Sequence, residues 1–260
     1  MIEFRDVWFW YEEGKIVLKS INFEFDEGIL AVVGPNGSGK TTLVKMMNGL
    51  IKPKKGDVII DGVNTRDVSV AELSRKVGYV FQNPEAMFFE ENVFKEVAFG
   101  PRNLGLSEEE IKKRVEWALK AVGLEGFEER NPFELSGGEK QRLAIACILA
   151  MKPRYLVLDE PNTGLDERST KNLIETIRKL RREGSSIILV THDMDLVLEL
   201  ADKVLLIFNG EVKFYGPVED FFELNLKEYY LKEPELITIA KNVGIGFVRS
   251  IEEIIKVIVR

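Results

Sequence analysis

The stretch GPNGSGKTT, Gly34 to Thr42, decides the fold of this 260-residue chain. It fits the pattern of Gly, four residues, then Gly-Lys-Thr, and it stands between the apolar run Ile29–Val33 and the helical pattern KTTLVKMMNGL. A short apolar run of this kind is typical of a strand buried on both faces of a parallel sheet. The order of strand, glycine-rich loop and helix therefore predicts an α/β fold with a phosphate-binding loop at the end of a strand.

The residues of this loop suit separate tasks in holding phosphate. The glycines at 34, 37 and 39 let backbone N–H groups approach phosphate oxygens, and the dipole of the following helix reinforces them. Lys40 supplies positive charge for the β- and γ-phosphates of a nucleotide, and the Thr41 hydroxyl is a ligand for Mg²⁺. The alternative, a glycine-rich turn without a ligand, is disfavoured because the motif lies at a strand-to-helix junction.

A second apolar run, YLVLDEP, carries Asp159 and Glu160 at its end. Burial penalises two adjacent carboxylates unless a metal or another partner compensates, so an exposed acidic turn is the weaker interpretation. With a phosphate-binding loop upstream, we interpret Asp159 as the carboxylate that organises Mg²⁺. Glu160 is then the group that polarises the water attacking the γ-phosphate.

The stretch LSGGEKQ, Leu135 to Gln141, is a second glycine-rich helix start. Taken alone, it fits an ordinary helix with Ser136 as its N-cap equally well. One chain seldom needs two anion sites of this kind for one nucleotide.

The remaining pattern completes a mixed α/β chain. Alternation in IEFRDVWFWY and IVLKSINFEF predicts two antiparallel strands, and SEEEIKKRVEWALKAVG predicts an amphipathic helix with Ser107 and Glu110 at capping-box spacing. The order YLVLDE, STKNLIETIRKLRREG, SIILVTH predicts parallel strands, and KVLLIFNGEVKFYG predicts a hairpin turning at Asn209-Gly210. We expect two or three short helices in the last 43 residues, around Pro234 and Gly244.

Composition limits the classes of function. The chain has 36 basic and 43 acidic residues, so a sequence-independent hold on nucleic acid is not expected. Cys147 is the only cysteine, which excludes an internal disulfide, and its apolar setting predicts a small buried core residue. We expect no signal peptide, and the apolar runs fall short of the roughly 18 residues that cross a bilayer. Any membrane span must then come from partners.

The order and spacing of GPNGSGKTT, LSGGE and YLVLDE resemble those of the ATP-binding cassette (ABC) family over residues 2–220. The resemblance implies a P-loop NTPase cassette with a mixed sheet core, an antiparallel β subdomain and an inserted helical subdomain. It also implies a head-to-tail dimer that sandwiches two ATP molecules. Ser136 and Gly138 of one subunit would then reach the γ-phosphate on the other, which explains the second glycine-rich helix start.

The resemblance also implies roles for individual residues. The catalytic residues would be Glu160, His192 and Gln82, and the Mg²⁺ ligands would be Thr41, Gln82 and Asp159. His192 is the only histidine in the chain and matches the switch histidine that contacts the γ-phosphate. ATP would contact Tyr11, Gly34, Pro35, Asn36, Gly37, Ser38, Gly39, Lys40, Thr41, Thr42, Ser136, Gly137, Gly138 and Asp166. Tyr11 would stack on adenine, although a surface strand aromatic remains the alternative.

The segment VGYVFQNPEAMFFEENVFKEVAFGPRNLGL, residues 77–106, resembles the ATPase subunits of energy-coupling factor (ECF) transporters and of cobalt and nickel importers. Met87 stands where that subgroup commonly has Gln, and NTGLD differs slightly from its usual loop at Asp166. The similarity divides the chain into an ATPase domain over residues 1–217, with a helical subdomain at about 84–134, and a helical extension over 218–260. The extension is a candidate dimerisation element, and a cap on its own domain is the alternative.

The resemblance thus implies an ATP-hydrolysing subunit of an ECF-type importer for a vitamin or a transition-metal ion. Its cofactors would be ATP and Mg²⁺. It would lie peripherally on the cytoplasmic face of the cell membrane, paired with itself or a paralogous ATPase. Its partners would be a transmembrane coupling protein and a substrate-capture membrane protein. The alternatives are an ATPase of another ABC importer class and a soluble ABC ATPase outside transport.

Overall fold

Six strands form the larger sheet in the computed structural model, which describes residues 1–258. They are β3 (Ile29–Val33), β6 (Val77–Val80), β7 (Tyr155–Asp159), β8 (Ser186–Val190), β9 (Lys203–Phe208) and β10 (Glu211–Pro217). Their order is β10-β9-β3-β8-β7-β6, and every pairing is parallel except that of β10 with β9. The expected mixed sheet is confirmed.

The strand order brings four distant segments of the chain to one edge. Since β3, β8, β7 and β6 are consecutive neighbours and parallel, their carboxyl ends meet there. The segments that follow these ends contain the glycine-rich loop, His192, Glu160 and Gln82. This edge is where parallel α/β sheets bind their ligands.

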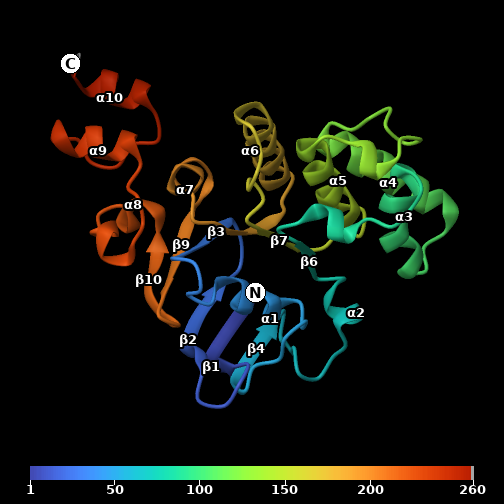
Figure 1. Ribbon diagram of the computed structural model, residues 1–260, viewed down its shortest axis with the longest axis horizontal. Coiled ribbons are helices and arrows are strands. Elements are labelled where there is room, and N and C mark those ends of the chain that lie inside the picture. The colour runs from blue at the N-terminus through green and yellow to red at the C-terminus, as the bar shows by residue number, and fades with distance from the viewer. Residues whose placement is uncertain (259–260) are drawn as a thin grey trace.

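A smaller antiparallel sheet packs beside the first (Figure 1). Its strands, in spatial order, are β2 (Ile16–Phe25), β1 (Ile2–Trp10), β4 (Lys55–Ile60) and β5 (Val63–Asn64). Helix α1 (Lys40–Met47) lies between the two sheets, because its buried residues share one core cluster with side chains of β1, β2, β4, β3, β7 and β8. The loop before α1 is therefore anchored on both sides.

The remaining helices divide between the two sides of the large sheet. They are α2 (Val70–Leu73), α3 (Val93–Asn103), α4 (Glu108–Val122), α5 (Gly137–Leu149), α6 (Glu167–Arg182) and α7 (Met194–Leu200), then α8 (Val218–Phe221), α9 (Glu235–Asn242) and α10 (Ile251–Ile258). Helix α2 packs on the same side of the large sheet as α1, since its Leu73 belongs to the same core cluster, and the other helices cover the opposite face or extend beyond it. Short 3-10 turns lie at η1 (Pro84–Met87), η2 (Pro132–Glu134) and η3 (Leu226–Tyr229). Helices α3, α4 and α5 pack together at one side, and α8 to α10 lie at the opposite side (Figure 1).

Two predicted helix starts differ in detail. Ser136 caps α5 with a complete capping box, in which its hydroxyl and the Glu139 carboxylate satisfy each other's backbone N–H. Ser107 caps α4, but the carboxylate of Glu110 accepts from Arg114 Nε at 2.7 Å instead of reaching back. The box at Ser107 is therefore only half formed.

Two features depart from what the sequence suggested. Strand β6 is only four residues long and its residues do not alternate between apolar and polar, so periodicity does not predict it. Cys147 was expected in the buried core, which is wrong, because it is half-buried and lines an apolar groove between α3 and α5. A small side chain on α5 leaves room for that groove.

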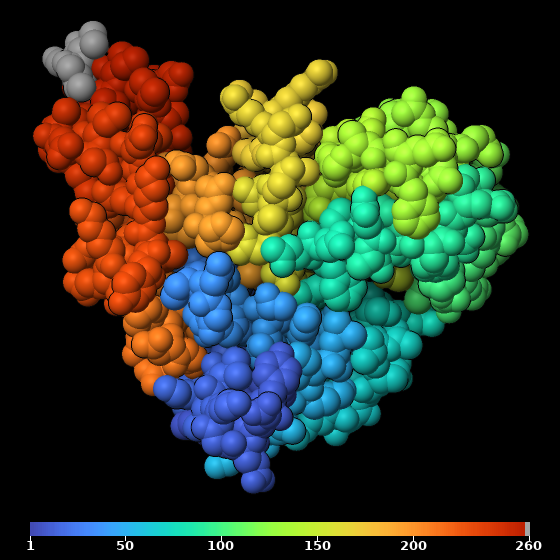
Figure 2. All heavy atoms as spheres, viewed as in Figure 1, coloured from blue at the N-terminus to red at the C-terminus, as the bar shows by residue number. Residues whose placement is uncertain are grey.

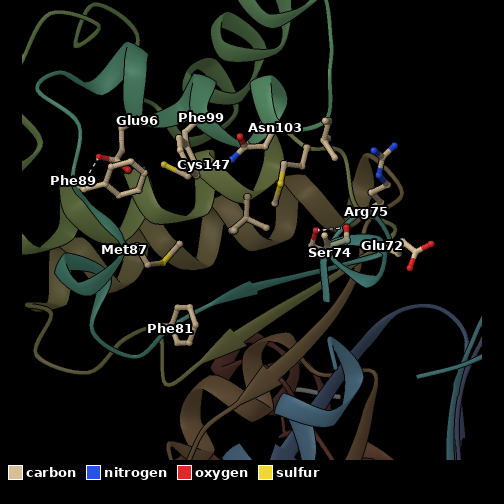
Figure 3. A pocket seen from close by; sticks show the side chains of 15 residues that line it. Glu72, Ser74, Arg75, Phe81, Met87, Phe89, Glu96, Phe99, Asn103 and Cys147 are labelled. Atoms are coloured by element: carbon tan, nitrogen blue, oxygen red, sulfur yellow. Dashed lines mark hydrogen bonds between the residues drawn. The ribbon is translucent and has the colours of Figure 1, made fainter. Parts of the chain in front are cut away.

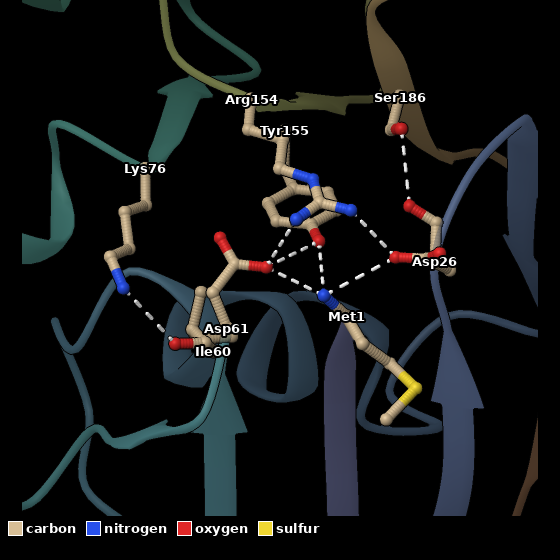
Figure 4. A network of polar contacts seen from close by, with 8 residues as sticks. All are labelled: Met1, Asp26, Ile60, Asp61, Lys76, Arg154, Tyr155 and Ser186. Carbon is tan, nitrogen blue, oxygen red and sulfur yellow. Dashed lines mark hydrogen bonds and ion pairs between the residues drawn. The ribbon is translucent and has the colours of Figure 1, made fainter.

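A polar network joins the two sheets at the amino end of β7 (Figure 4). The Tyr155 hydroxyl donates to Asp61 Oδ1 at 2.9 Å, and Arg154 pairs with Asp61 at 2.8 Å and with Asp26 at 2.7 Å. The amino group of Met1 donates to Asp61 and to the Tyr155 hydroxyl, both at 2.6 Å. This network fixes the end of β7 that lies away from the ligand edge.

The space-filling view shows the last helices of the chain projecting at one side and the segment that contains α3, α4 and α5 at the other (Figure 2). Helix α6 projects between them. Within residues 1–258, no helix has both the length and the apolar character needed to span a bilayer.

Candidate nucleotide site

The glycine-rich loop follows β3 directly and leads into α1. Gly39 is the N-cap residue of α1, and no side chain caps that helix, so its first N–H groups are available to an anion. Gly34 has a φ of 146°, and a Cβ there would collide with the carbonyl oxygen of Ile207 on β9. The path of the loop therefore depends on the missing side chain at this position.

Lys40 lies buried inside the loop. Its ammonium donates to the carbonyl oxygens of Gly34 at 2.8 Å and Pro35 at 3.0 Å, so the backbone is wrapped around it. Burial lowers the pKa of Lys40, and the nearby carboxylates of Glu160 and Asp159 oppose that shift. A positive charge held here faces the space above the loop.

Asp159 ends β7 with both carboxylate oxygens contacted. The Thr41 hydroxyl donates to Oδ1 at 3.3 Å, and the Tyr79 hydroxyl donates to Oδ2 at 2.6 Å. Asp159 itself is only 4% exposed. Sequence reasoning missed Tyr79, because an aromatic residue in the apolar strand VGYV is typical of a core residue.

Glu160 follows Asp159 in a left-handed conformation, with a φ of 49°. Such a conformation costs about 1 kcal/mol or more for a residue other than glycine and is concentrated at functional sites. Its backbone N–H donates to the carbonyl of Val190 at 2.9 Å, which holds the residue over the end of β8. His192, just beyond β8, places Nδ1 2.9 Å from Oε1 and 2.8 Å from Oε2 of Glu160.

A cavity of about 350 Å³ lies beside these residues, and its lining is Tyr11, Val17, Asn36, Gly37, Gly39, Lys40, Thr41, Thr42, Gln82 and Glu160. Tyr11 stands at its mouth, 63% exposed, and its hydroxyl lies 3.1 Å from Thr42 Oγ1. An exposed aromatic ring beside a phosphate-binding loop is suited to stacking on a base.

Seven of the residues assigned to ATP do not line this cavity. Three of them, Gly34, Pro35 and Ser38, belong to the loop itself, and the other four are Ser136, Gly137, Gly138 and Asp166. The Ser136 hydroxyl is engaged in its capping box, and Asp166 caps α6 by accepting from the N–H of Ser169 at 2.7 Å. Gly138 packs against Ser169, with a Cβ position only 2.8 Å from Ser169 Cβ. Within one chain, the site therefore comprises the loop, the strand ends and Tyr11.

The site has oxygen atoms that are suitable ligands for Mg²⁺. They are the Thr41 hydroxyl, the Asp159 carboxylate and the Gln82 side-chain amide, whose oxygen is of the type that Mg²⁺ prefers. Among residues 1–258, no group of three or more His, Cys, Asp and Glu side chains is arranged to hold a metal ion. Mg²⁺ is usually held through one or two carboxylates and completes its shell with water and substrate phosphates, and Asp159 supplies such a carboxylate beside Thr41 and Lys40. The residues present therefore fit the ion.

A phosphate loop after a central strand, a carboxylate pair on a neighbouring strand and a histidine beside the second carboxylate together define a P-loop ATPase. The ABC transporter family model matches residues 18–163. The chain belongs to the ABC transporter family and, within it, to the ECF-type ATPases, as the following relatives show.

Two curated relatives span most of the chain. A protein of Pyrococcus horikoshii, named as an ABC transporter ATP-binding protein, is 78% identical over 99% of both chains. The energy-coupling factor transporter ATP-binding protein EcfA of Methanocaldococcus jannaschii is 46% identical, over 85% of this chain and 81% of its own.

Solved structures give the same fold. The protein cbiO1 of Clostridium perfringens, part of the ABC transporter complex cbiONQ, superposes with a TM-score of 0.81 at 32% identity, over 92% of this chain and 98% of its own. A dimeric ATP-binding cassette in a post-hydrolysis state with ADP and Pi superposes with a TM-score of 0.73 at 31% identity, over 84% of this chain and 99% of its own. The chain is therefore an ATPase that couples ATP hydrolysis to transport.

Proposed function

We propose that this protein hydrolyses ATP in the cavity above β3, β7 and β8 to energise an ECF-type importer of a vitamin or a transition-metal ion. The contact between Glu160 and His192 carries the proposal, since it places a carboxylate and a proton donor together above the loop that holds Lys40. The membership in the ECF-type ATPases supports the importer class.

The chemistry follows from what each side chain can do. Lys40 and the N–H groups of the loop bind the β- and γ-phosphates, and Tyr11 stacks on the base. Thr41, Gln82 and Asp159 would hold Mg²⁺, which supplies charge neutralisation on the phosphates. Glu160 accepts a proton from the attacking water, an effect worth about 10²–10⁴ in rate.

Ser136, Gly138 and Asp166 do not line the cavity, and they are suited to an interface with a second copy of the chain or with a paralogous ATPase. Ser136 and Gly138 lie at the start of α5, and they would complete the site of the opposite subunit. Asp166, at the start of α6, would join the same interface. The dimeric solved relative with ADP and Pi supports this arrangement.

An apolar groove of about 490 Å³ is suited to a membrane partner (Figure 3). It lies between the α2 segment, the end of β6, α3 and α5, and the rings of Phe89 and Phe99 pack edge-on at 4.6 Å on one wall. Phe89 is 58% exposed and Phe99 41%. We propose that a helix of a transmembrane coupling protein docks here, which places the ATPase peripherally on the cytoplasmic face of the cell membrane.

We propose the division into an ATPase domain over residues 1–217, with its helical subdomain at about 84–134, and an extension over 218–260. The first part of the extension packs on its own domain, because Phe221, Phe222 and Ile237 share a core cluster with α7 and β9. Its later part leaves several apolar side chains exposed, namely Ile239, Val243, Ile251, Ile255 and Val257. This supports a contact between the two ATPase subunits, in addition to the cap on its own domain.

The test is affinity capture of the full chain from its native membranes, with the copurifying proteins identified by mass spectrometry. Recovery of a coupling protein and a small integral membrane protein supports the proposal, and the small protein identifies the cargo. Recovery of soluble partners alone overturns the transport role and leaves the ATPase chemistry intact.

A pair of variants tests the groove in the same experiment. Phe89→Glu puts a charge on the apolar wall and should abolish recovery of the coupling protein while ATP binding persists. The matched control is Trp117→Glu on α4, outside the groove, where the ring is 37% exposed. Equal recovery with Phe89→Glu and Trp117→Glu would place the partner elsewhere.

A further inference from the structure

Tyr79 on β6 is a buried tyrosine whose hydroxyl meets a carboxylate of the nucleotide site. It is 5% exposed, its ring belongs to the core cluster between the two sheets, and its hydroxyl donates to Asp159 Oδ2 at 2.6 Å. The phenol is the donor in this bond and the carboxylate oxygen is the acceptor.

The geometry of the sheet fixes this contact. Tyr79 pairs with Val157 on β7, and Asp159 lies two residues further, so both side chains point to the same face. That face is the one covered by α1, from which Thr41 reaches the other oxygen of Asp159 at 3.3 Å. Each carboxylate oxygen is thus held by a hydroxyl from a different element.

The phenol is not needed to fill the core. A phenylalanine would supply the same ring, which packs at 4.8 Å from the ring of Phe81. Burying a hydroxyl costs free energy unless it is hydrogen-bonded, and here its partner is a charged group at the ligand edge. The hydroxyl therefore has a task that the ring alone does not perform.

We propose that Tyr79 is a positioning residue for magnesium binding. Its hydroxyl holds Oδ2 of Asp159, so that Oδ1 of the same carboxylate is presented toward Thr41 and the phosphates. The proposal rests on the proposed role of Asp159 as the metal-organising carboxylate. Tyr79 touches neither nucleotide nor metal, and it acts through Asp159. Without the hydroxyl, Oδ2 is left buried without this donor, and the carboxylate is free to rotate.

The experiment measures binding, independent of turnover. The affinity of the full chain for a non-hydrolysable ATP analogue is determined with Mg²⁺ and with a chelator, and the ratio of the two is the gain from magnesium. Tyr79→Phe should reduce this gain about ten-fold, because a hydrogen bond to a charged group is lost, and should leave the affinity in chelator within two-fold. An unchanged gain in a folded Tyr79→Phe protein overturns the proposal.

Tyr155→Phe is the matched control. Tyr155 is also buried and also donates to an aspartate, Asp61, but it lies at the opposite end of β7 from Asp159. Its variant should lower the unfolding temperature and leave the gain from magnesium unchanged. If Tyr155→Phe reduces the gain as much as Tyr79→Phe does, the effect is one of general loosening and the proposal fails.

A double-mutant cycle separates this inference from the function on which it rests. Asp159→Asn should remove most of the gain from magnesium, and adding Tyr79→Phe to it should change nothing further. Retention of the gain in Asp159→Asn would refute the metal role of Asp159 itself. Loss of the gain in Asp159→Asn, with a full gain in Tyr79→Phe, would refute only the inference about Tyr79.

Discussion

His192 holds Glu160 through a single ring nitrogen that lies within 2.9 Å of both carboxylate oxygens. The two residues follow adjacent parallel strands, β8 and β7, so the sheet itself sets their separation. His192 is exposed to 58% at its side chain and Glu160 to 10%, so the histidine faces the solvent and the carboxylate faces the protein. Of the two side chains, only that of Glu160 lines the cavity.

Glu160→Gln should retain ATP binding and lose turnover by about 10²–10⁴-fold, because the amide keeps the shape of the side chain but cannot accept the proton. The measurement is the rate of phosphate release beside the affinity for ATP. Hydrolysis at the parental rate would remove Glu160 from the catalytic role.

His192→Ala should reduce turnover by up to about 10²-fold, since Glu160 loses the donor that fixes its orientation. We expect KM for ATP to change less than kcat, because His192 does not line the cavity. Steady-state kinetics at saturating Mg²⁺ separate the two. A rise in KM alone would show that His192 binds substrate and does not orient the base.

Tyr11→Ala should weaken ATP binding by about ten-fold if the ring stacks on adenine, whereas Tyr11→Phe should keep most of the affinity. The contact between the Tyr11 hydroxyl and Thr42 Oγ1 is partly buried, and Tyr11→Phe removes it while keeping the ring. Tyr230→Ala serves as the control, since that ring is 81% exposed and lies in the extension. Equal affinities for Tyr11→Ala and the parent would support the surface-aromatic interpretation.

Gly138→Ala should destabilise the fold by about 1–3 kcal/mol, because the new Cβ meets Ser169 at the contact between α5 and α6. Gly137→Ala is the matched control in the same turn, where nothing lies within 4 Å and alanine favours the helix. Chemical denaturation measures both. Adding Ser169→Gly should restore the stability that Gly138→Ala loses. If it does not, the strain has another source.

Glu96, in α3, is expected to make stability depend on pH. Its carboxylate accepts from the N–H groups of Phe89 at 2.9 Å and Glu90 at 2.8 Å, yet burial raises its pKa. A raised pKa in the folded state stabilises the fold at low pH, and this contribution is lost as the pH rises through that pKa.

The Glu96→Gln variant should therefore gain unfolding temperature over the parent at about pH 8 and less so at about pH 5. Glu116→Gln, at an exposed position on α4, should show no such trend. If Glu96→Gln changes the unfolding temperature by the same amount at both pH values, the burial argument is contradicted.

Much of the site was predictable because local signals and chain order agree. The loop from Gly34 to Thr42 has a spacing that few other structures require. In YLVLDE the apolar run has the length of one short strand, so its two carboxylates are expected at the end of that strand. The roles of Ser136 and Asp166 came from the resemblance, and one chain alone does not bring them into the cavity.

Other features depend on tertiary packing, which periodicity does not reveal. Tyr79 has the pattern of a core residue, and only the register of β6 on β7 brings its hydroxyl to Asp159. The left-handed backbone of Glu160 has no signal in residue type, since such conformations usually favour glycine or asparagine. Cys147 looked like core because its neighbours are apolar, but the groove beside it exists only once α3 is placed.

Strand β7 carries Tyr155 at its first position and Asp159 at its last, five residues in all. At about 3.3 Å per residue, roughly 13 Å separate the ionic anchor at one end from the carboxylate at the other. The ionic contacts that join the two sheets and the carboxylate of the nucleotide site thus lie at opposite ends of one strand. A change in the charges around Asp61 and Arg154 is therefore expected to alter the junction of the sheets and leave the surroundings of Asp159 intact.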